Sequence, residues 1–179
     1  LAEDYPLAKM HSVVVRAQDG LDLGCYYTLP VWSDRRRPGI PDKPLPLILI
    51  PHGGPWGRDV WDFNPNHQWL ASRGYAVLSV NFRSSTGFGK AFINAGNHQW
   101  GKKVISDQHD AVRWAVAEGI ADPKRIGVYG GSFGGYSALA GLAFTPEFFA
   151  CGVDLVGPSN LVTLLEMIPP YWKADLELF

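Results

Sequence analysis

Residues 126–142 join an apolar, β-branched run to a glycine-flanked serine and then to a run of small and apolar residues. Within them, residues 130–134 read Gly-Gly-Ser-Phe-Gly, a Gly-x-Ser-x-Gly sequence centred on Ser132. This order predicts a strand, a sharp turn and a helix, with the serine hydroxyl exposed at the carboxyl end of a parallel sheet. Gly130 and Gly134 are expected because a Cβ there would collide where strand and helix nearly touch. The N–H groups at the start of such a helix favour negative charge beside the serine.

A glycine-rich turn whose serine only caps a helix is the simpler interpretation, and a second motif argues against it. Residues 47–50 form a continuous apolar run, as expected of a strand buried on both faces. The run leads into His52-Gly53-Gly54-Pro55. In hydrolases built around a nucleophilic serine on such a turn, a strand followed by His-Gly-Gly supplies one N–H group of the oxyanion hole. We interpret His52 as a residue that shapes this loop rather than as a catalytic base.

The composition is that of one globular domain. The chain has 179 residues, of which 46% are hydrophobic and 18% charged, so it can bury a core. The net charge of -1 gives no reason to expect nucleic acid or an anionic membrane surface as a partner. No apolar run approaches the roughly 20 residues of a membrane span. Cys25 and Cys151 have no metal or redox spacing, so we expect buried thiols and neither a metal nor another cofactor.

The other elements follow from periodicity and turn residues. Two strands are expected to form a hairpin through a two-residue turn at Asp19-Gly20. Asn64 is expected to cap a helix that has Pro65 at its first position. Besides the strand and helix around Ser132, strands are expected over residues 11–17, 21–29, 47–50, 75–80 and 151–156, the last of them buried, and helices over 64–73, 107–118 and 161–167. Alternating strands and helices predict a doubly wound, mostly parallel α/β sheet.

Four stretches of the chain together resemble one family. They are His52-Gly53-Gly54-Pro55, residues 81–89 (NFRSSTGFG), Trp100-Gly101 and residues 130–136. In this order they resemble the catalytic domain of the prolyl oligopeptidase family of serine peptidases, closest to acylaminoacyl-peptidase-like bacterial members. The resemblance covers about residues 11–170 and implies an α/β-hydrolase fold.

The sequence departs from the family pattern at three positions. Ser84 stands where the family usually has glycine, and Phe88 and Phe133 stand where it often has tyrosine. The aromatic exchanges are mild, whereas Ser84 affects the backbone turn expected in its loop.

The resemblance also implies a catalytic site. Ser132 would be the nucleophile, and the N–H groups of Phe133 and Gly54 would be the oxyanion donors, with Gly53 as the less favoured choice. The reaction would hydrolyse the peptide bonds of oligopeptides through an acyl-Ser132 intermediate. A carboxylesterase with the same loops is one alternative, and a non-catalytic binding module with an inactive elbow is another.

The rest of the catalytic triad is not evident in this sequence. In this fold the order is the serine, then an acid, then a histidine. The histidines, which all precede Ser132, are His11, His52, His67, His98 and His109. Asp154 follows Ser132, but in the family the acid comes later. We therefore expect residues 1–179 to be the N-terminal part of a single α/β-hydrolase peptidase domain, incomplete at its C-terminal end.

Three further expectations follow from an incomplete domain. A β-propeller would precede these residues, and the catalytic Asp and His would lie outside them. Residues 1–179 alone would be inactive. We expect them to self-associate or to bind the remainder of their own domain, because the last strand would leave a sheet edge unpaired.

Overall fold

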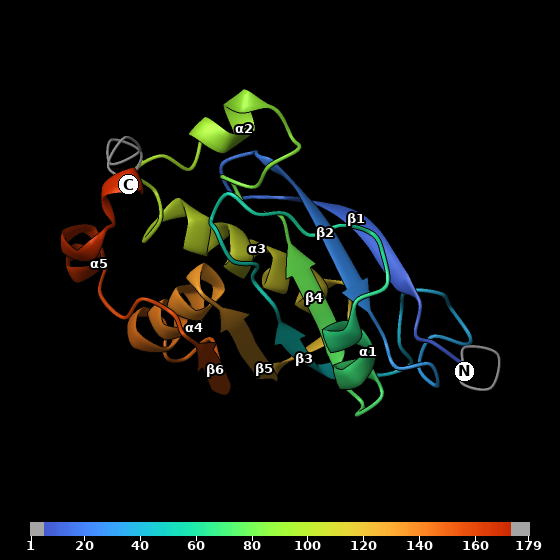
Figure 1. The fold of residues 1–179 in the computed structure, drawn as a ribbon. Helices are drawn as coiled ribbons and strands as arrows, with labels where there is room; N and C mark the ends of the chain where they lie inside the picture. The colour runs from blue at the N-terminus through green and yellow to red at the C-terminus, as the bar shows by residue number, and fades with distance from the viewer. Residues whose placement is uncertain (1–5, 173–179) are drawn as a thin grey trace.

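The computed structural model describes residues 6–172, which form a mixed sheet with helices on both faces. The strand order is β1-β2-β4-β3-β5-β6, with β1 and β6 at opposite edges (Figure 1). The strands are β1 (Met10–Arg16), β2 (Asp22–Thr28), β3 (Leu45–Leu49), β4 (Ala76–Val80), β5 (Ala121–Gly131) and β6 (Cys151–Leu155). β2 is antiparallel to β1 and β4, whereas β4, β3, β5 and β6 run parallel to one another. The predicted doubly wound, mostly parallel α/β sheet is therefore confirmed.

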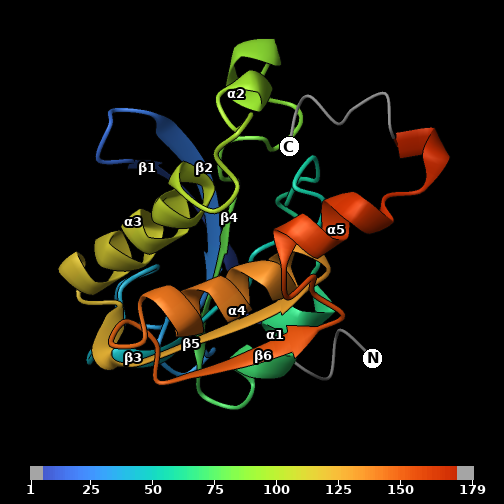
Figure 2. The same ribbon diagram turned by 90° about the vertical axis from the view of Figure 1, so that its left-hand side faces the viewer.

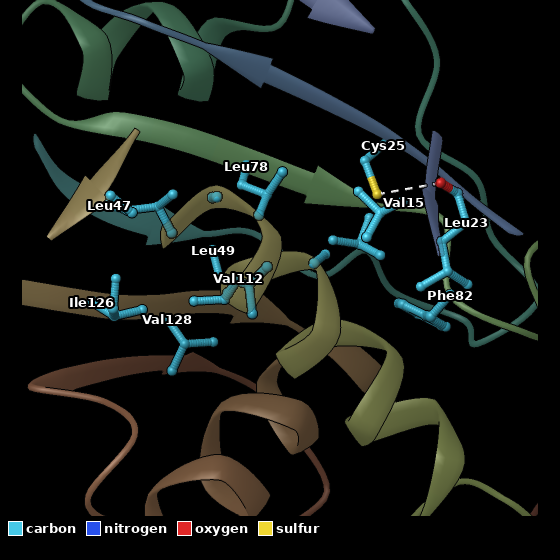
Figure 3. Packing of buried hydrophobic residues seen from close by; sticks show 14 of the residues in the cluster. Val15, Leu23, Cys25, Leu47, Leu49, Leu78, Phe82, Val112, Ile126 and Val128 are labelled. Carbon is cyan, nitrogen blue, oxygen red and sulfur yellow. Dashed lines mark hydrogen bonds between the residues drawn. The ribbon is translucent and has the colours of Figure 1, made fainter. Parts of the chain in front are cut away.

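Helices pack on both faces of this sheet (Figure 2). The helices of the described residues are α1 (Pro65–Ala71), α2 (Lys90–Asn94), α3 (Lys103–Ala117), α4 (Phe133–Phe144) and α5 (Leu161–Met167). α3 and α4 pack on one face, and α1 packs on the other against β2 and β4. The main core lies under α3 and α4, where Leu49, Leu78, Val112 and Val128 pack together (Figure 3). No helix in the described part of the chain is long and apolar enough to cross a membrane.

Most helices and strands lie where the sequence predicts them. Asn64 caps α1, where its side chain accepts from the N–H groups of Asn66 and His67 at 2.9 and 3.2 Å. α5 has the predicted bounds, whereas α3 begins four residues before its predicted start. Cys25 is buried as expected, and its burial raises the pKa of the thiol.

The turn between β1 and β2 is longer than predicted. The Ala17 N–H donates to Leu21 O at 2.8 Å, and the Gly20 N–H donates back to Ala17 O at 2.9 Å. These bonds enclose three residues rather than two, with Gly20 in the left-handed region at φ 88°. A type I turn followed by a left-handed glycine is the usual three-residue hairpin, and Asp-Gly suits it as well as the tighter turn.

β6 is not the buried strand that its sequence predicts. Gly152 and Asp154 face α4, so by strand alternation Cys151, Val153 and Leu155 face the other side of the sheet. Cys151 is exposed, and Val153 and Leu155 are nearly half exposed. Among the described elements none covers that face of β6 or pairs with its outer edge. An apolar strand sequence cannot distinguish a central position from an edge position, and this is why the prediction of burial was wrong.

Candidate active site

Ser132 occupies a strained turn between β5 and α4. Its backbone lies at φ 54° and ψ −121°, which is rare for a residue with a side chain. A Cβ on Gly130 would collide with the backbone of Gly134, and a Cβ on Gly134 would collide with Pro51 O at the end of β3. The Ser132 N–H donates to Leu155 O at 2.8 Å, which ties the turn to β6. The two glycines are therefore steric requirements of the turn.

The Ser132 side chain is exposed and does not cap its helix. Ser132 stands at the position before α4, yet its hydroxyl makes no capping hydrogen bond. Among residues 6–172 the hydroxyl has no hydrogen-bond partner at all. The simpler interpretation of this serine as a helix cap is therefore wrong.

A cavity of about 600 Å³ brings the expected site residues together. Gly54, Ser132 and Phe133 all line it, whereas Gly53 does not. In the described part of the chain, neither the Gly54 N–H nor the Phe133 N–H donates a hydrogen bond. One hydroxyl and two unused N–H groups thus meet at one hollow. An oxyanion hole requires donors of this kind.

The loop that carries Gly54 is held by its own backbone. Gly54 lies at φ 127°, and a Cβ on it would meet Trp56 N and lie 2.6 Å from Gly57 N. This glycine is thus required by the turn itself, in addition to any approach of a substrate.

His52 lies beneath this loop with both ring nitrogens engaged. Nδ1 is 2.8 Å from Gly53 O, and Nε2 is 2.8 Å from Ser85 Oγ. Burial lowers the pKa of its imidazole. The His52 ring thus contacts the backbone of the loop, as expected of a residue that shapes it.

Other histidines also have partners away from the serine. His11 contacts Asp34 at 2.8 Å, and His109 lies against Phe148 with ring centroids 4.4 Å apart. In residues 6–172 no hydrogen bond joins a histidine to Ser132. The described residues also contain no group of three or more His, Cys, Asp or Glu placed to hold a metal ion.

Asp154, the first aspartate after Ser132 in the sequence, stabilises a turn. Its Oδ1 accepts from the Gly157 N–H at 2.8 Å, just after β6. Between them Val156 adopts φ 52°, an unusual conformation for a β-branched residue. Val156 and Gly157 line the cavity, so Asp154 supports the cavity wall.

Most of the cavity wall consists of residues that the sequence did not identify as site residues. Its further residues are Trp56, Trp100, Val156, Gly157, Pro158, Leu164 and Trp172. Trp100 packs edge-on against Trp56 and Phe133, with ring centroids 5.6 and 5.1 Å apart. Residues 156–158 follow the carboxyl end of a strand, where ligands of parallel sheets bind, and this signal could have identified them. Leu164 and Trp172 carry no comparable signal in the sequence.

Comparison with known proteins gives one consistent family. The model of the prolyl oligopeptidase family matches residues 61–174. Dipeptidyl aminopeptidase BIII of Pseudoxanthomonas mexicana is 53% identical over 175 residues, which are 98% of this chain and 25% of that protein. Dipeptidyl peptidase family member 6 of Caenorhabditis elegans is 48% identical over 94% of this chain and 25% of its own length. The chain thus spans about a quarter of the length of these relatives.

Solved structures agree with the sequence relatives. An acylaminoacyl peptidase in complex with Z-Gly-Gly-Phe-chloromethyl ketone superposes with a TM-score of 0.84 at 25% identity, over 98% of this chain and 27% of that chain. A puromycin hydrolase superposes with a TM-score of 0.85 at 26% identity, over 96% of this chain and 26% of that one.

Proposed function

The chain belongs to the prolyl oligopeptidase family, and from this premise we propose that it forms part of a serine peptidase that hydrolyses oligopeptides through an acyl-Ser132 intermediate. One observation carries the proposal. The exposed Ser132 hydroxyl, which does not cap its helix, shares a cavity with the unused N–H groups of Gly54 and Phe133.

In the proposed reaction Ser132 Oγ attacks the carbonyl carbon of the scissile bond. The N–H groups of Gly54 and Phe133 donate hydrogen bonds to the oxygen that becomes negative, and each such donor contributes roughly 10²–10³ in rate. The serine proton passes to a base and then to the leaving amine. Water afterwards hydrolyses the acyl-serine ester. No step requires a metal or another cofactor.

We also propose that the base and its orienting acid come from polypeptide beyond residue 179. Residues 1–179 would then be the N-terminal part of one peptidase domain, with a propeller before it. The order of serine, acid and histidine in this fold supports this division, because all five histidines of the chain precede Ser132.

The residues of the cavity wall favour substrates with an apolar side chain next to the scissile bond. Trp56, Trp100 and Leu164 supply aromatic and aliphatic surface, and the cavity lining contains no charged side chain. A related acylaminoacyl peptidase is bound by a chloromethyl ketone that ends in phenylalanine. We therefore expect peptides with an apolar residue before the scissile bond to be better substrates than peptides with a charged residue there.

The test is Ser132→Ala in the full-length protein that contains these residues. We expect kcat/KM toward peptide p-nitroanilides to fall by roughly 10⁴-fold or more, as for other serine peptidases. Ser106→Ala, on the exposed side of α3, is the matched control and should retain activity. Activity retained by a correctly folded Ser132→Ala protein would refute the assignment. Hydrolysis of simple p-nitrophenyl esters without peptide cleavage would instead favour the carboxylesterase alternative, and a wild-type protein inactive on both would favour the binding module.

The edge of β6 supports an interaction with another strand. Val153 and Leu155 present apolar surface there, and the outer backbone groups of β6 have no partner strand among the described residues. We propose that residues 1–179 alone self-associate through this edge or bind the remainder of their own domain. Light scattering should show dimers or larger species, and a stable monomer at high concentration would contradict this.

A further inference from the structure

The peptide unit between Gly53 and Gly54 connects His52 to the proposed oxyanion donor. His52 Nδ1 lies 2.8 Å from Gly53 O, and a carbonyl oxygen can only accept, so Nδ1 must carry a hydrogen. A trans peptide is planar, and its C=O and N–H bonds point in opposite directions. Holding the Gly53 carbonyl toward His52 therefore turns the Gly54 N–H away from the ring and fixes its direction.

Ser85 contacts the other ring nitrogen of His52, and its hydroxyl can either donate to this nitrogen or accept from it. Its Oγ lies 2.8 Å from His52 Nε2 and 2.6 Å from Phe82 O, and the side chain is completely buried. In a neutral ring with Nδ1–H, Nε2 accepts the single hydroxyl hydrogen of Ser85. In a protonated ring, Nε2–H donates to Ser85 Oγ, and the hydroxyl hydrogen turns to Phe82 O. In both states Nδ1–H remains on Gly53 O.

We propose that Ser85 and His52 are positioning residues, with Ser85 holding the imidazole in place through Nε2 and the Nδ1–H of His52 holding Gly53 O, which aims the Gly54 N–H into the cavity. The inference rests on the proposed function, in which this N–H stabilises the oxyanion. It also gives residues 81–89 a role, since none of them lines the cavity.

The surroundings of the pair fit this role. The His52 ring stacks on Phe82 with centroids 4.2 Å apart and planes at 18°. A Cβ on Gly57 would collide with Gly53 O and lie 2.9 Å from His52 Nδ1, so only a glycine leaves room for this hydrogen bond. The Thr86 N–H donates a hydrogen bond to Gly57 O at 2.9 Å. The segment that contains Phe82, Ser85 and Thr86 thus forms the support under the glycine loop.

Two substitutions of His52 separate the proposed role from simple packing. The amide nitrogen of asparagine can occupy the place of Nδ1, whereas the glutamine amide reaches the place of Nε2. In the full-length protein we expect His52→Gln to lower kcat by about 10- to 100-fold with little change in KM, because one oxyanion donor is misdirected. His52→Asn should stay within about fivefold of the wild type, and Ser85→Ala should fall between the two.

Equal losses in His52→Gln and His52→Asn, or a loss confined to KM, would overturn the inference. Neutron diffraction from crystals of the wild-type protein provides a readout that depends neither on activity nor on the folding of variants. We expect hydrogen density on His52 Nδ1, and density on Nε2 alone would overturn the inference. Failure of the proposed function would appear separately, as activity retained in Ser132→Ala.

Discussion

At the scale of single residues, Ser84 is the position where the structure most clearly loses stability. It is completely buried at φ 85°, and its hydroxyl has no hydrogen-bond partner among the described residues. The loop therefore has the backbone conformation that glycine adopts without strain, which agrees with the glycine usual in the family at this position.

We expect Ser84→Gly to stabilise the protein by about 1 kcal/mol. The change removes backbone strain and an unsatisfied buried hydroxyl, which together exceed the added freedom of glycine in the unfolded chain. Ser137 is the matched control, because this buried hydroxyl accepts from Gln108 Nε2 at 3.1 Å. Ser137→Ala should lower the free energy of unfolding measured in urea, and a Ser84→Gly protein that is also less stable would contradict this account.

His67 makes the stability of the fold depend on pH. The ring is buried between Thr28 Oγ1 and Ser79 Oγ at 2.9 and 3.0 Å, and burial lowers its pKa from 6.5 to about 4. Between these values the unfolded chain binds a proton that the folded chain does not, so stability rises with pH. The contribution of His67 should lower the free energy of unfolding by about 3 kcal/mol as the pH drops from 6.5 to 4.

The measurement is the urea midpoint of His67→Gln and of the wild type at several pH values. The variant should show a shallower decline below pH 6.5. Part of the decline should remain in the variant, because burial also lowers the pKa of His109 to about 4. An unchanged pH dependence in His67→Gln would mean that the folded protein accommodates the charged ring.

At the scale of elements, Arg83 connects the hairpin turn to α3. It donates to both oxygens of Asp107 at 2.6 and 2.8 Å and to both oxygens of Asp19 at 2.9 and 3.1 Å. Arg83 and Asp107 are almost completely buried, whereas Asp19 is partly exposed. Hydrogen bonds from Arg83 and Lys103 hold the pKa of Asp19 well below its usual range.

We expect Arg83→Ala to destabilise the protein by roughly 3–5 kcal/mol, because Asp107 would remain buried without a partner. Arg16, whose bond to Asp22 is exposed, is the matched control. Arg16→Ala should cost less than about 1 kcal/mol in the same denaturation experiment. Similar small effects of both substitutions would show that water replaces Arg83 around Asp107.

Elements were predictable where local chemistry determines them. The Asn64 cap and the Pro65 that follows it set the start of α1, and the glycines around Ser132 require the turn between β5 and α4. The hairpin turn length and the exposure of β6 were not predictable in this way. Asp-Gly fits two turn lengths, and burial depends on which elements pack nearby rather than on the strand sequence.

At the scale of the whole molecule, the site forms where the carboxyl ends of parallel strands meet. Gly54 follows β3, Ser132 follows β5 and Val156 follows β6, and all three line one cavity. Gly54 and Ser132 could be predicted because each belongs to a sequence motif with glycines at fixed positions. Leu164 and Trp172 could not, because their place in the wall depends on how the segment after β6 folds back over the cavity.

Labelling of Ser132 by a fluorophosphonate, followed by tandem mass spectrometry, tests the central claim most directly. The full-length protein should carry one adduct on Ser132, and Ser132→Ala should carry none. Residues 1–179 alone should label poorly, because no histidine of the described residues forms a hydrogen bond with the serine. Labelling of the full-length protein at another residue would contradict the assignment of Ser132, and stoichiometric labelling of residues 1–179 alone would show that a histidine upstream of Ser132 serves as its base.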